Sequence, residues 1–360
     1  MIGHLDLDYF YAQVEEVGKP SLKDSPVLVC VFSGRNEDSG VVSTANYKAR
    51  EYGVRSGMPI SQAKKKLLGR EAIFIPMDHH KYEIISERIM KQVRQDVDLF
   101  EQTGIDEAFF DITKSSEHDY DRAKSIASAM KARIFSSETL TCSVGIGPNK
   151  IVAKIASDFS KPDGLTIVTP TNSKRFLASL EVERLYGVGP KTSEILRRAG
   201  INTLGELGAS SPEDLAEHFS RKLAVYLHDA ANGENDEMVV PNSDITQLSR
   251  IVTLKRDTRE MDEILRQLSP LVQDLQSRLI SKNLLFKSIT AIGILTDLSI
   301  KTKNRKIESP TNDQMTLDVQ VRALFQELVS SVDLDLRRAG VRVADLINSA
   351  DQTSLTQYLQ

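Results

Sequence analysis

The stretch FEQTGIDEAFFDI, residues 100–112, holds two short apolar runs on either side of an acidic turn. Runs so close together predict a β-hairpin with strands near 100–105 and 108–112. Along a regular strand, Asp106 and Glu107 would point to opposite faces of the sheet. A turn or bulge between the strands instead lets both carboxylates reach one edge of the sheet.

Outward from this hairpin, hydrophobic periodicity predicts further elements. The strands are expected at 2–8, 140–146 and 165–168, and the helices at about 79–99, 120–136 and 149–159. Without residues 11–76, which hold β-rich runs of their own, the order begins strand, helix, strand, strand, helix, strand. This order is the split βαβ, ferredoxin-like pattern with a long insertion after the first strand.

After residue 170 the chain changes to short helices with glycine punctuation, and the polar stretch 233–243 favours a linker. Beyond the linker, the sequence predicts another small α/β unit. Its expected elements are a strand near 249–254, helices near 261–281 and 317–329, and further segments at 288–299 and 332–343. The fold class expected from the pattern is therefore α+β with several domains.

Three acids could do chemistry together. The ferredoxin-like order places the first strand beside the hairpin, so that Asp6 converges on Asp106 and Glu107. Three oxygen ligands without His or Cys suit Mg²⁺ held with phosphates better than Zn²⁺. Two such ions, about 4 Å apart, would clamp the attacking and leaving oxygens of a phosphoryl transfer. Any one of these acids alone is more simply a solvating residue at a strand end.

A second cluster lies in the insertion, within TANYKAR. Tyr47 and Arg50 are three residues apart and share a face of a predicted helix, which Thr44 would continue at its N-terminal end. A hydroxyl, a phenol and a guanidinium on one face make a plausible grip for a triphosphate, and Lys161 in SKPDG could add a point charge. The alternative is a solvated helix face and a turn lysine.

The third signal is LYGVGPKTSEILRRAG at 185–200. Gly187 and Gly189 permit a tight turn, and the free N–H groups of the helix that follows favour a phosphate, with Lys191 adding positive charge. This is the hairpin-helix-hairpin pattern of sequence-independent contact with a DNA backbone. Such motifs also bind proteins, so the pattern alone does not decide between the two.

Composition limits the class of protein. The length of 360 residues predicts two or three domains, and 40% hydrophobic with 27% charged residues is ordinary for a soluble globular chain. No apolar run is long enough to span a membrane, and no basic leader opens the chain. The two cysteines are expected to be buried thiols of a cytoplasmic protein.

Charge is unevenly distributed. The net charge is −4, yet residues 244–342 hold 16 Lys and Arg against 13 Asp and Glu. The stretch KTKNRK at 301–306 puts four cations in six residues. It is either a solvated loop or a contact to phosphates.

Four longer motifs resemble a known family. DLDYFYAQVEE, VFSGRNEDSGVVSTANYKAREYGV, GIDEAFFDI and VGIGPNKIVAKIASDFSKPDG occur in order, and the match runs from residue 1 to about 340. They resemble the archaeal DNA polymerase IV group of Y-family translesion polymerases. The resemblance implies a palm (1–10 and 77–165), fingers (11–76), a thumb (166–232), a linker (233–243), a little finger (244–341) and a tail (342–360).

The resemblance also assigns roles to residues. It implies metal ligation by Asp6, Asp106, Glu107 and the backbone carbonyl of Leu7, which together would hold two Mg²⁺ ions. Tyr11 matches the steric gate that excludes a ribose 2′-hydroxyl, with Phe10 beside it. The implied triphosphate contacts are Thr44, Tyr47, Arg50 and Lys161, and the implied DNA contacts are Gly187, Gly189 and Lys191.

Two departures and a tail motif complete the comparison. The family usually has Ser where this chain has Gly104, and its little-finger entry usually reads Ser-Ile-Gly-Arg where this chain has QLSR at 247–250. The tail resembles a clamp-binding box that would plug a helical turn into a sliding clamp. Its residues are Gln352, Leu355, Tyr358 and Leu359, with Leu359 in place of an aromatic residue.

The function expected from these observations is a template-directed, Mg²⁺-dependent DNA polymerase that tolerates damaged template bases. The expected partners are primer-template DNA, a dNTP and the sliding clamp, and the protein is expected to be a monomer without a membrane partner. Two rivals remain: a catalytically silent DNA-binding scaffold, and a nucleotidyl cyclase, which shares the palm-like fold and two-metal chemistry but needs neither a hairpin-helix-hairpin nor a clamp box.

Overall fold

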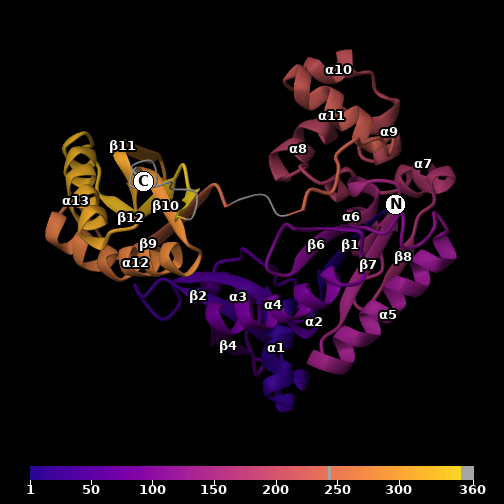
Figure 1. The fold of residues 1–360 in the computed structure, drawn as a ribbon, viewed down its shortest axis with the longest axis horizontal. Coiled ribbons are helices and arrows are strands. Elements are labelled where there is room, and N and C mark those ends of the chain that lie inside the picture. The colour runs from indigo at the N-terminus through magenta and orange to yellow at the C-terminus, as the bar shows by residue number, and fades with distance from the viewer. Residues whose placement is uncertain (242–244, 350–360) are drawn as a thin grey trace, which may run out of the picture. The chain divides into compact units, whose positions relative to one another are not determined.

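The computed structural model describes residues 1–241 and 245–349 (Figure 1). The chain divides into two compact units. The first comprises Met1–Cys30, Val42–Met58 and 65–241, and the second comprises Val31–Val41, Pro59–Lys64 and 245–349. Within the part of the chain that is described, no helix is long and apolar enough to cross a membrane.

The first unit is built on a five-stranded sheet with the order β5-β6-β1-β7-β8. Its strands are β1 (Ile2–Leu7), β5 (Leu99–Gln102), β6 (Glu107–Asp111), β7 (Cys142–Gly147) and β8 (Leu165–Ile167). The central strand β1 is antiparallel to both of its neighbours. This is the ferredoxin-like order with β8 added at one edge, so the fold class expected from the sequence is confirmed.

Three helices cover the two faces of this sheet. They are α4 (His79–Arg94), α5 (Tyr120–Glu138) and α6 (Lys150–Phe159). Leu5 and Leu7 of β1 belong to the core shared with α4 and α5, whereas His4 turns to the other face and meets Ser157 of α6. Since side chains alternate along a strand, Asp6 shares the face of His4. The polar face of β1 is therefore the one beside α6.

Side-chain caps define where these helices begin. Asp78 accepts a hydrogen bond from the Lys81 N–H ahead of α4, and Asp119 and Asn149 cap α5 and α6 in the same way. Helix α4 ends at Arg94 and not near residue 99 as predicted, because residue 99 pairs in the hairpin opposite Asp111.

The segment after β1 contains helix α1 (Phe10–Gly18), a 3₁₀ turn (Pro20–Asp24), a three-stranded sheet and two short helices. The sheet has the order β3-β2-β4, from β2 (Val27–Phe32), β3 (Gly40–Ala45) and β4 (Ile73–Pro76), and the helices are α2 (Tyr47–Glu51) and α3 (Ile60–Lys66). Thr44 lies in β3 and does not continue the helix of Tyr47, so that prediction was wrong. The reason is the side chain of Asn46, which caps α2 by accepting from the Ala49 N–H.

Short helices follow β8, as predicted. They are α7 (Pro170–Ala178), the 3₁₀ turn Val182–Arg184, α8 (Pro190–Arg198), α9 (Leu204–Ala209), α10 (Pro212–Ala216) and α11 (Arg221–Ala231). The stretch 233–241 has no helix or strand, yet Val239 is buried against Ile2 and Phe109 of the sheet. Part of the predicted linker is therefore packed against the first unit.

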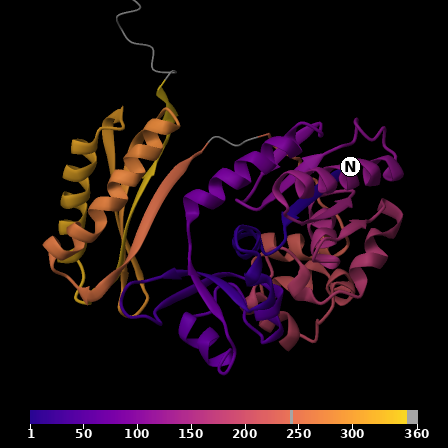
Figure 2. The same cartoon turned by 90° about the horizontal axis from the view of Figure 1, so that it is seen from below.

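The second unit is a sheet with two helices on one face. Its strands are β9 (Gln247–Thr258), β10 (Leu284–Leu295), β11 (Ile300–Thr311), β12 (Leu336–Ala344) and the short β13 (Ile347–Asn348), and its helices are α12 (Met261–Ser281) and α13 (Gln314–Ser330). Figure 2 shows both helices along the same side of the sheet, which has the order β11-β10-β12-β9. The cationic stretch 301–306 lies in β11 and is not a loop, because pairing with β10 extends from Ile300 to Lys306.

Candidate active site

The three acids meet at one end of two neighbouring strands. Asp6 of β1 lies directly opposite Glu107 of β6, and the Leu7 N–H donates to the Asp106 carbonyl at 2.8 Å. Asp106 stands in the turn between β5 and β6, which frees it from strand alternation. The hairpin and the central strand thus bring these acids together in space.

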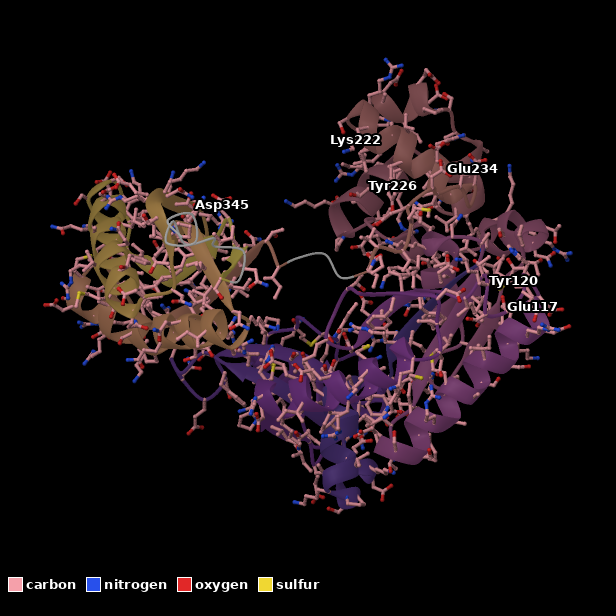
Figure 3. All side chains as sticks on the ribbon, viewed as in Figure 1. Glu117, Tyr120, Lys222, Tyr226, Glu234 and Asp345 are labelled. Atoms are coloured by element: carbon pink, nitrogen blue, oxygen red, sulfur yellow. The ribbon has the colours of Figure 1, made fainter. Side chains whose placement is uncertain are left out.

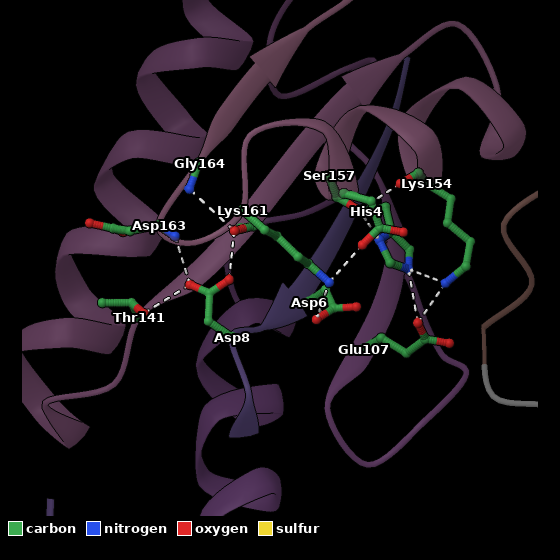
Figure 4. A network of polar contacts seen from close by, with 12 residues as sticks. His4, Asp6, Asp8, Glu107, Thr141, Lys154, Ser157, Lys161, Asp163 and Gly164 are labelled. Carbon is green, nitrogen blue, oxygen red and sulfur yellow. Dashed lines mark hydrogen bonds and ion pairs between the residues drawn. The ribbon is translucent and has the colours of Figure 1, made fainter. Parts of the chain in front are cut away.

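Lysines from α6 and the loop after it hold two of these carboxylates (Figure 4). Lys161 Nζ lies 2.7 Å from an oxygen of Asp6 and 2.7 Å from one of Asp158, and Lys154 Nζ donates to Glu107 at 2.6 Å. Among residues 1–241 and 245–349, no three His, Cys, Asp or Glu side chains are arranged as a ready metal site. The backbone brings the three acids close together, and ion pairs with Lys161 and Lys154 orient the carboxylates of Asp6 and Glu107.

The electrostatics of the site differ from one acid to the next. Burial raises the pKa of Asp6 to about 6, against the opposing effect of Lys161, and burial also raises the pKa of Asp106. Hydrogen bonding from His4, followed by that from Lys154, holds the pKa of Glu107 at about 2. Buried carboxyls whose pKa values are raised favour a nearby cation, and such perturbations concentrate at functional sites.

Sequence reasoning missed His4 and Lys154. The His4 ring is fully buried, with Nδ1 2.7 Å from Ser157 Oγ and Nε2 3.5 Å from Glu107. A signal for the lysine was available in the sequence, since Lys154 and Asp158 are four residues apart on one predicted helix and Lys161 follows its end. A lysine on a helix that is expected to pack beside the first strand could have been predicted to pair with one of the acids.

Gly104 lies against the same carboxylate. A Cβ on this glycine would stand 2.9 Å from Cγ of Glu107 and 3.4 Å from Oδ1 of Asp106. The serine usual in the family would therefore displace the Glu107 side chain from its present position. The departure noted in the sequence leaves the three acids in place and gives Glu107 more room.

Tyr11, in helix α1, has its ring held by stacking. Its ring stacks on Tyr82 of α4, with centroids 4.3 Å apart and an interplanar angle of 18°, and Tyr82 in turn donates to Glu15 at 2.7 Å. The Tyr11 ring remains half-buried and can meet a ligand. Phe10 is buried in the core at 2% exposure, so that only its backbone could do so.

Tyr47 and Arg50 form one unit on α2. The Arg50 guanidinium lies 4.9 Å from the centroid of the Tyr47 ring, and its Nε donates to the Ala45 carbonyl at 2.9 Å. Burial raises the pKa of Tyr47, and the charges of Asp8, Arg50, Lys161 and Asp6 also act on it. The phenol therefore lies within electrostatic range of Asp6. Thr44, on β3, is partly buried.

Only one of the two glycines in the turn before α8 has a backbone conformation that favours glycine. Gly187 has φ +89°, which favours glycine, while Gly189 is in an extended conformation and Lys191 is exposed. Tyr226 of α11, labelled in Figure 3, donates to the Tyr186 carbonyl at 2.7 Å and fixes the turn.

The cations at the far end of α8 are already paired. Arg197 contacts Glu183, and Arg198 contacts Glu194. The N–H groups at the start of α8 and the side chain of Lys191 therefore remain as the phosphate-binding features of this motif.

A cavity of about 370 Å³ adjoins Glu107. The residues that line it include Glu107, Lys150, Lys154, Tyr186 and Tyr226. An acidic metal-ligand candidate, two lysines and two aromatic rings thus face one space. The predicted clamp box at 352–359 lies outside the described residues.

Known protein families and individual relatives match this chain in sequence. Models of the impB/mucB/samB family match residues 5–158, and models of its C-terminal domain match residues 245–356. The chain belongs to the impB/mucB/samB family. It is 40% identical over 359 residues to DNA polymerase IV of Nitrosopumilus maritimus, and 40% identical over 364 residues to DNA polymerase IV of Methanosarcina acetivorans, with 99% of each chain covered in both cases.

Solved structures agree with this assignment. A Y-family DNA polymerase chimera superposes with a TM-score of 0.87 at 34% identity, over 96% of this chain and 99% of that chain. An insertion ternary complex of Dbh DNA polymerase gives a TM-score of 0.72 at 35% identity, again over 96% and 99%. The resemblance to Y-family polymerases drawn from the sequence motifs is confirmed.

Proposed function

We propose that this protein extends a primer 3′ end with dNTPs by two-metal phosphoryl transfer, using Asp6, Asp106 and Glu107. It is a DNA-directed DNA polymerase of the translesion type, with low fidelity and low processivity, acting on primer-template DNA. The observation that carries the proposal is the meeting of these acids beside Lys161. Neither the scaffold nor the cyclase receives support from the relatives.

The family implies a divalent cation, and we assign it as Mg²⁺, with two ions per site. Asp6, Asp106, Glu107 and the Leu7 carbonyl would hold the ions, since hard oxygen donors without His or Cys suit this metal. When bound, Mg²⁺ would polarise the α-phosphate and favour ionisation of the primer 3′-hydroxyl. For Asp6 and Glu107 to bind the metal ions, Lys161 and Lys154 must exchange these carboxylate partners for phosphate oxygens.

The remaining residues bind and orient the substrates. Tyr11 would lie under the deoxyribose, supported from behind by buried Phe10. Thr44, Tyr47, Arg50 and Lys161 would contact the triphosphate, which offers charge-assisted hydrogen bonds to a guanidinium and an ammonium. The turn Gly187–Gly189 and Lys191 would hold the DNA backbone, and the adjoining cavity would admit the primer end.

The decisive test is primer extension on a template that carries an abasic site. The polymerase is expected to insert a nucleotide opposite the lesion in the presence of Mg²⁺. A silent scaffold would bind the same DNA in an anisotropy titration without extending it. Extension on undamaged template but none past the lesion would retain the polymerase and remove the translesion assignment.

Lys161→Ala should raise the KM for the dNTP. Loss of a hydrogen bond to a charged group removes about 1.5–3 kcal/mol, or roughly ten- to a hundredfold in binding. Steady-state primer extension with varied dNTP concentration measures this. Lys161→Arg retains the charge and should lose less, and Lys124→Ala, on the exposed face of α5, is the control. An unchanged KM in Lys161→Ala would remove this lysine from the nucleotide site.

We also propose that the C-terminal box docks into a sliding clamp. Gln352, Leu355 and Tyr358 are spaced for one helical face, and Leu359 follows them. A leucine and a tyrosine gain roughly 1.5–3 kcal/mol each when fully buried in a partner's pocket. Ordering the segment offsets part of this gain, so the contact should be reversible and of micromolar strength.

Removal of residues 349–360 should abolish stimulation by the clamp and leave extension on a short free primer-template unchanged. Leu355→Ala combined with Tyr358→Ala should reproduce the truncation, because these side chains are the proposed anchors. Calorimetric titration with the clamp measures the contact directly. Equal affinity for full-length and truncated protein would place the contact elsewhere.

A further inference from the structure

Asp8 is a buried carboxylate that the chemistry described so far does not use. It is 1% exposed. Its oxygens accept from Thr141 Oγ1 at 2.8 Å, from Ser143 Oγ at 2.7 Å and from the backbone N–H of Asp163 at 2.8 Å (Figure 4). A buried carboxylate is expensive to desolvate, and these donors offset that cost.

The same residue anchors the start of α1 to strand β7. The Gln13 amide donates to the Asp8 carbonyl at 2.8 Å, and its oxygen accepts from the Thr141 N–H at 2.5 Å. Asp8 thus binds Ser143 of β7 and Thr141 just before it through its side chain, and Thr141 again through Gln13, which accepts at one end and donates to the Asp8 backbone carbonyl at the other. Tyr11 lies in the first turn of this helix, between Asp8 and Gln13. The position of the Tyr11 ring therefore depends on this anchor as well as on stacking.

The third partner of Asp8 belongs to the loop 160–164, which carries Lys161. Asp163 has φ +55°, an unfavourable conformation for a residue with a side chain. The loop is also held where Ser143 Oγ accepts from the Gly164 N–H at 3.2 Å and where Lys131 pairs with Asp163 at 2.7 Å. Of these contacts, those of Asp8 and Ser143 are hydrogen bonds accepted from backbone N–H groups of the loop.

We propose that Asp8 is a positioning residue that fixes Lys161 relative to Tyr11, and so sets the separation between the triphosphate contact and the sugar gate. This inference rests on the proposed function. A dNTP bridges the two sites, so both must lie at one fixed spacing for the nucleotide to bind productively. Displacement of Lys161 from the triphosphate would weaken dNTP binding by roughly tenfold or more, as expected for the loss of a hydrogen bond to a charged group.

Asparagine cannot replace Asp8 fully. Three donors converge on the carboxylate, which is an acceptor only, whereas an amide presents two N–H donors of its own. The hydroxyls of Thr141 and Ser143 can rotate to accept from an amide, but the backbone N–H of Asp163 cannot. In Asp8→Asn, an amide oxygen turned toward the Asp163 N–H keeps that bond, but Ser143 must then reverse its hydroxyl to accept. Each remaining bond also loses the charge of the carboxylate, which roughly halves its strength. With the amide turned the other way, one of its N–H groups opposes the N–H of Asp163.

The test compares Asp8→Asn with Asp98→Asn in the full chain. Asp98 accepts from the N–H groups of Lys114 at 2.7 Å and Ser115 at 3.2 Å, and so also clamps a loop. It precedes β5 at the end of the sheet opposite the acids. Both variants should lose thermal stability, and Asp8→Asn should lose more, because Asp8 is buried and Asp98 is partly exposed. Only Asp8→Asn should raise the KM for the dNTP, by about tenfold or more, with a smaller change in kcat.

Two further readouts separate positioning from a general loss of structure. Amide hydrogen exchange at 160–164, measured without DNA or nucleotide, should accelerate in Asp8→Asn and not in Asp98→Asn. Selection of dNTP over rNTP should weaken in Asp8→Asn, because Tyr11 and Lys161 are no longer held at a fixed distance from each other. Should Asp8→Asn fold poorly, Thr141→Val removes one of the three donors, retains the carboxylate, and should show the same effects in weaker form.

Wild-type KM and unchanged loop exchange in Asp8→Asn would overturn the inference, and so would equal KM changes in both variants. Failure of the proposed function would look different, because the wild-type protein itself would then not extend a primer. The exchange experiment does not depend on polymerase activity.

Discussion

Asp106→Asn should lower nucleotide incorporation by about a thousandfold or more, because loss of one carboxylate from a metal clamp removes several kcal/mol of transition-state stabilisation. Primer-template affinity should stay within a few fold of wild type, since Asp106 lies among the proposed metal ligands and the DNA backbone is assigned to the turn Gly187–Gly189. Single-turnover extension gives the rate, and fluorescence anisotropy gives the affinity.

The same variant should be no less stable than wild type at neutral pH. Burial raises the pKa of Asp106, so the ionised carboxylate is less favourable in the folded protein than in the unfolded chain. At a pH above its pKa this charge therefore lowers the free energy of unfolding, and a neutral amide removes that effect. Thermal melts at pH 7.5 and in the absence of Mg²⁺ measure it.

The matched control is Asp119→Asn. Asp119 caps α5 by accepting from the N–H groups of Asp121 and Arg122, and asparagine is also a good helix cap. This variant should extend primers at the wild-type rate. Retained extension by Asp106→Asn at saturating Mg²⁺ would remove Asp106 from the metal site, whatever its stability.

The sequence predicted the sheet because its signals are local. The hairpin at 100–112 and the alternation of Leu5 and Leu7 with polar residues are properties of neighbouring residues, and the ferredoxin-like order follows from them. The meeting of Asp6 and Glu107 could be anticipated from this order alone, since the order makes their strands neighbours.

What the sequence did not predict depends on contacts between distant residues. Lys154 reaches Glu107 across 47 positions, and the Asp163 N–H reaches Asp8 across 155. Thr44 was assigned to a helix face because nothing nearby in the sequence shows that Asn46 caps the helix after it. The stretch 301–306 looked like a loop because charge, and not alternation, dominates it, while pairing with β10 makes it a strand.

Tyr11→Ala should admit ribonucleotides. A 2′-hydroxyl pressed against a fixed ring is an overpacked contact, which costs about 1–3 kcal/mol, or roughly ten- to a hundredfold in rate. The ring cannot easily yield, because it stacks on Tyr82 at 4.3 Å and Tyr82 is itself fully buried and bonded to Glu15. Removing the Tyr11 ring should therefore raise the rNTP to dNTP incorporation ratio by that factor, with little change in base choice.

Tyr11→Phe separates the ring from its hydroxyl. The phenylalanine ring can stack on Tyr82 as tyrosine does, so this variant should exclude ribonucleotides as wild type does, if bulk is what forms the gate. Paired incorporation assays with rNTP and dNTP on one undamaged template give the ratio for each variant. Should Tyr11→Phe admit ribonucleotides as readily as Tyr11→Ala, the hydroxyl would be the discriminating group. An unchanged ratio in both would mean that another residue closes the sugar pocket, because neither the ring nor its hydroxyl would then meet the 2′ position.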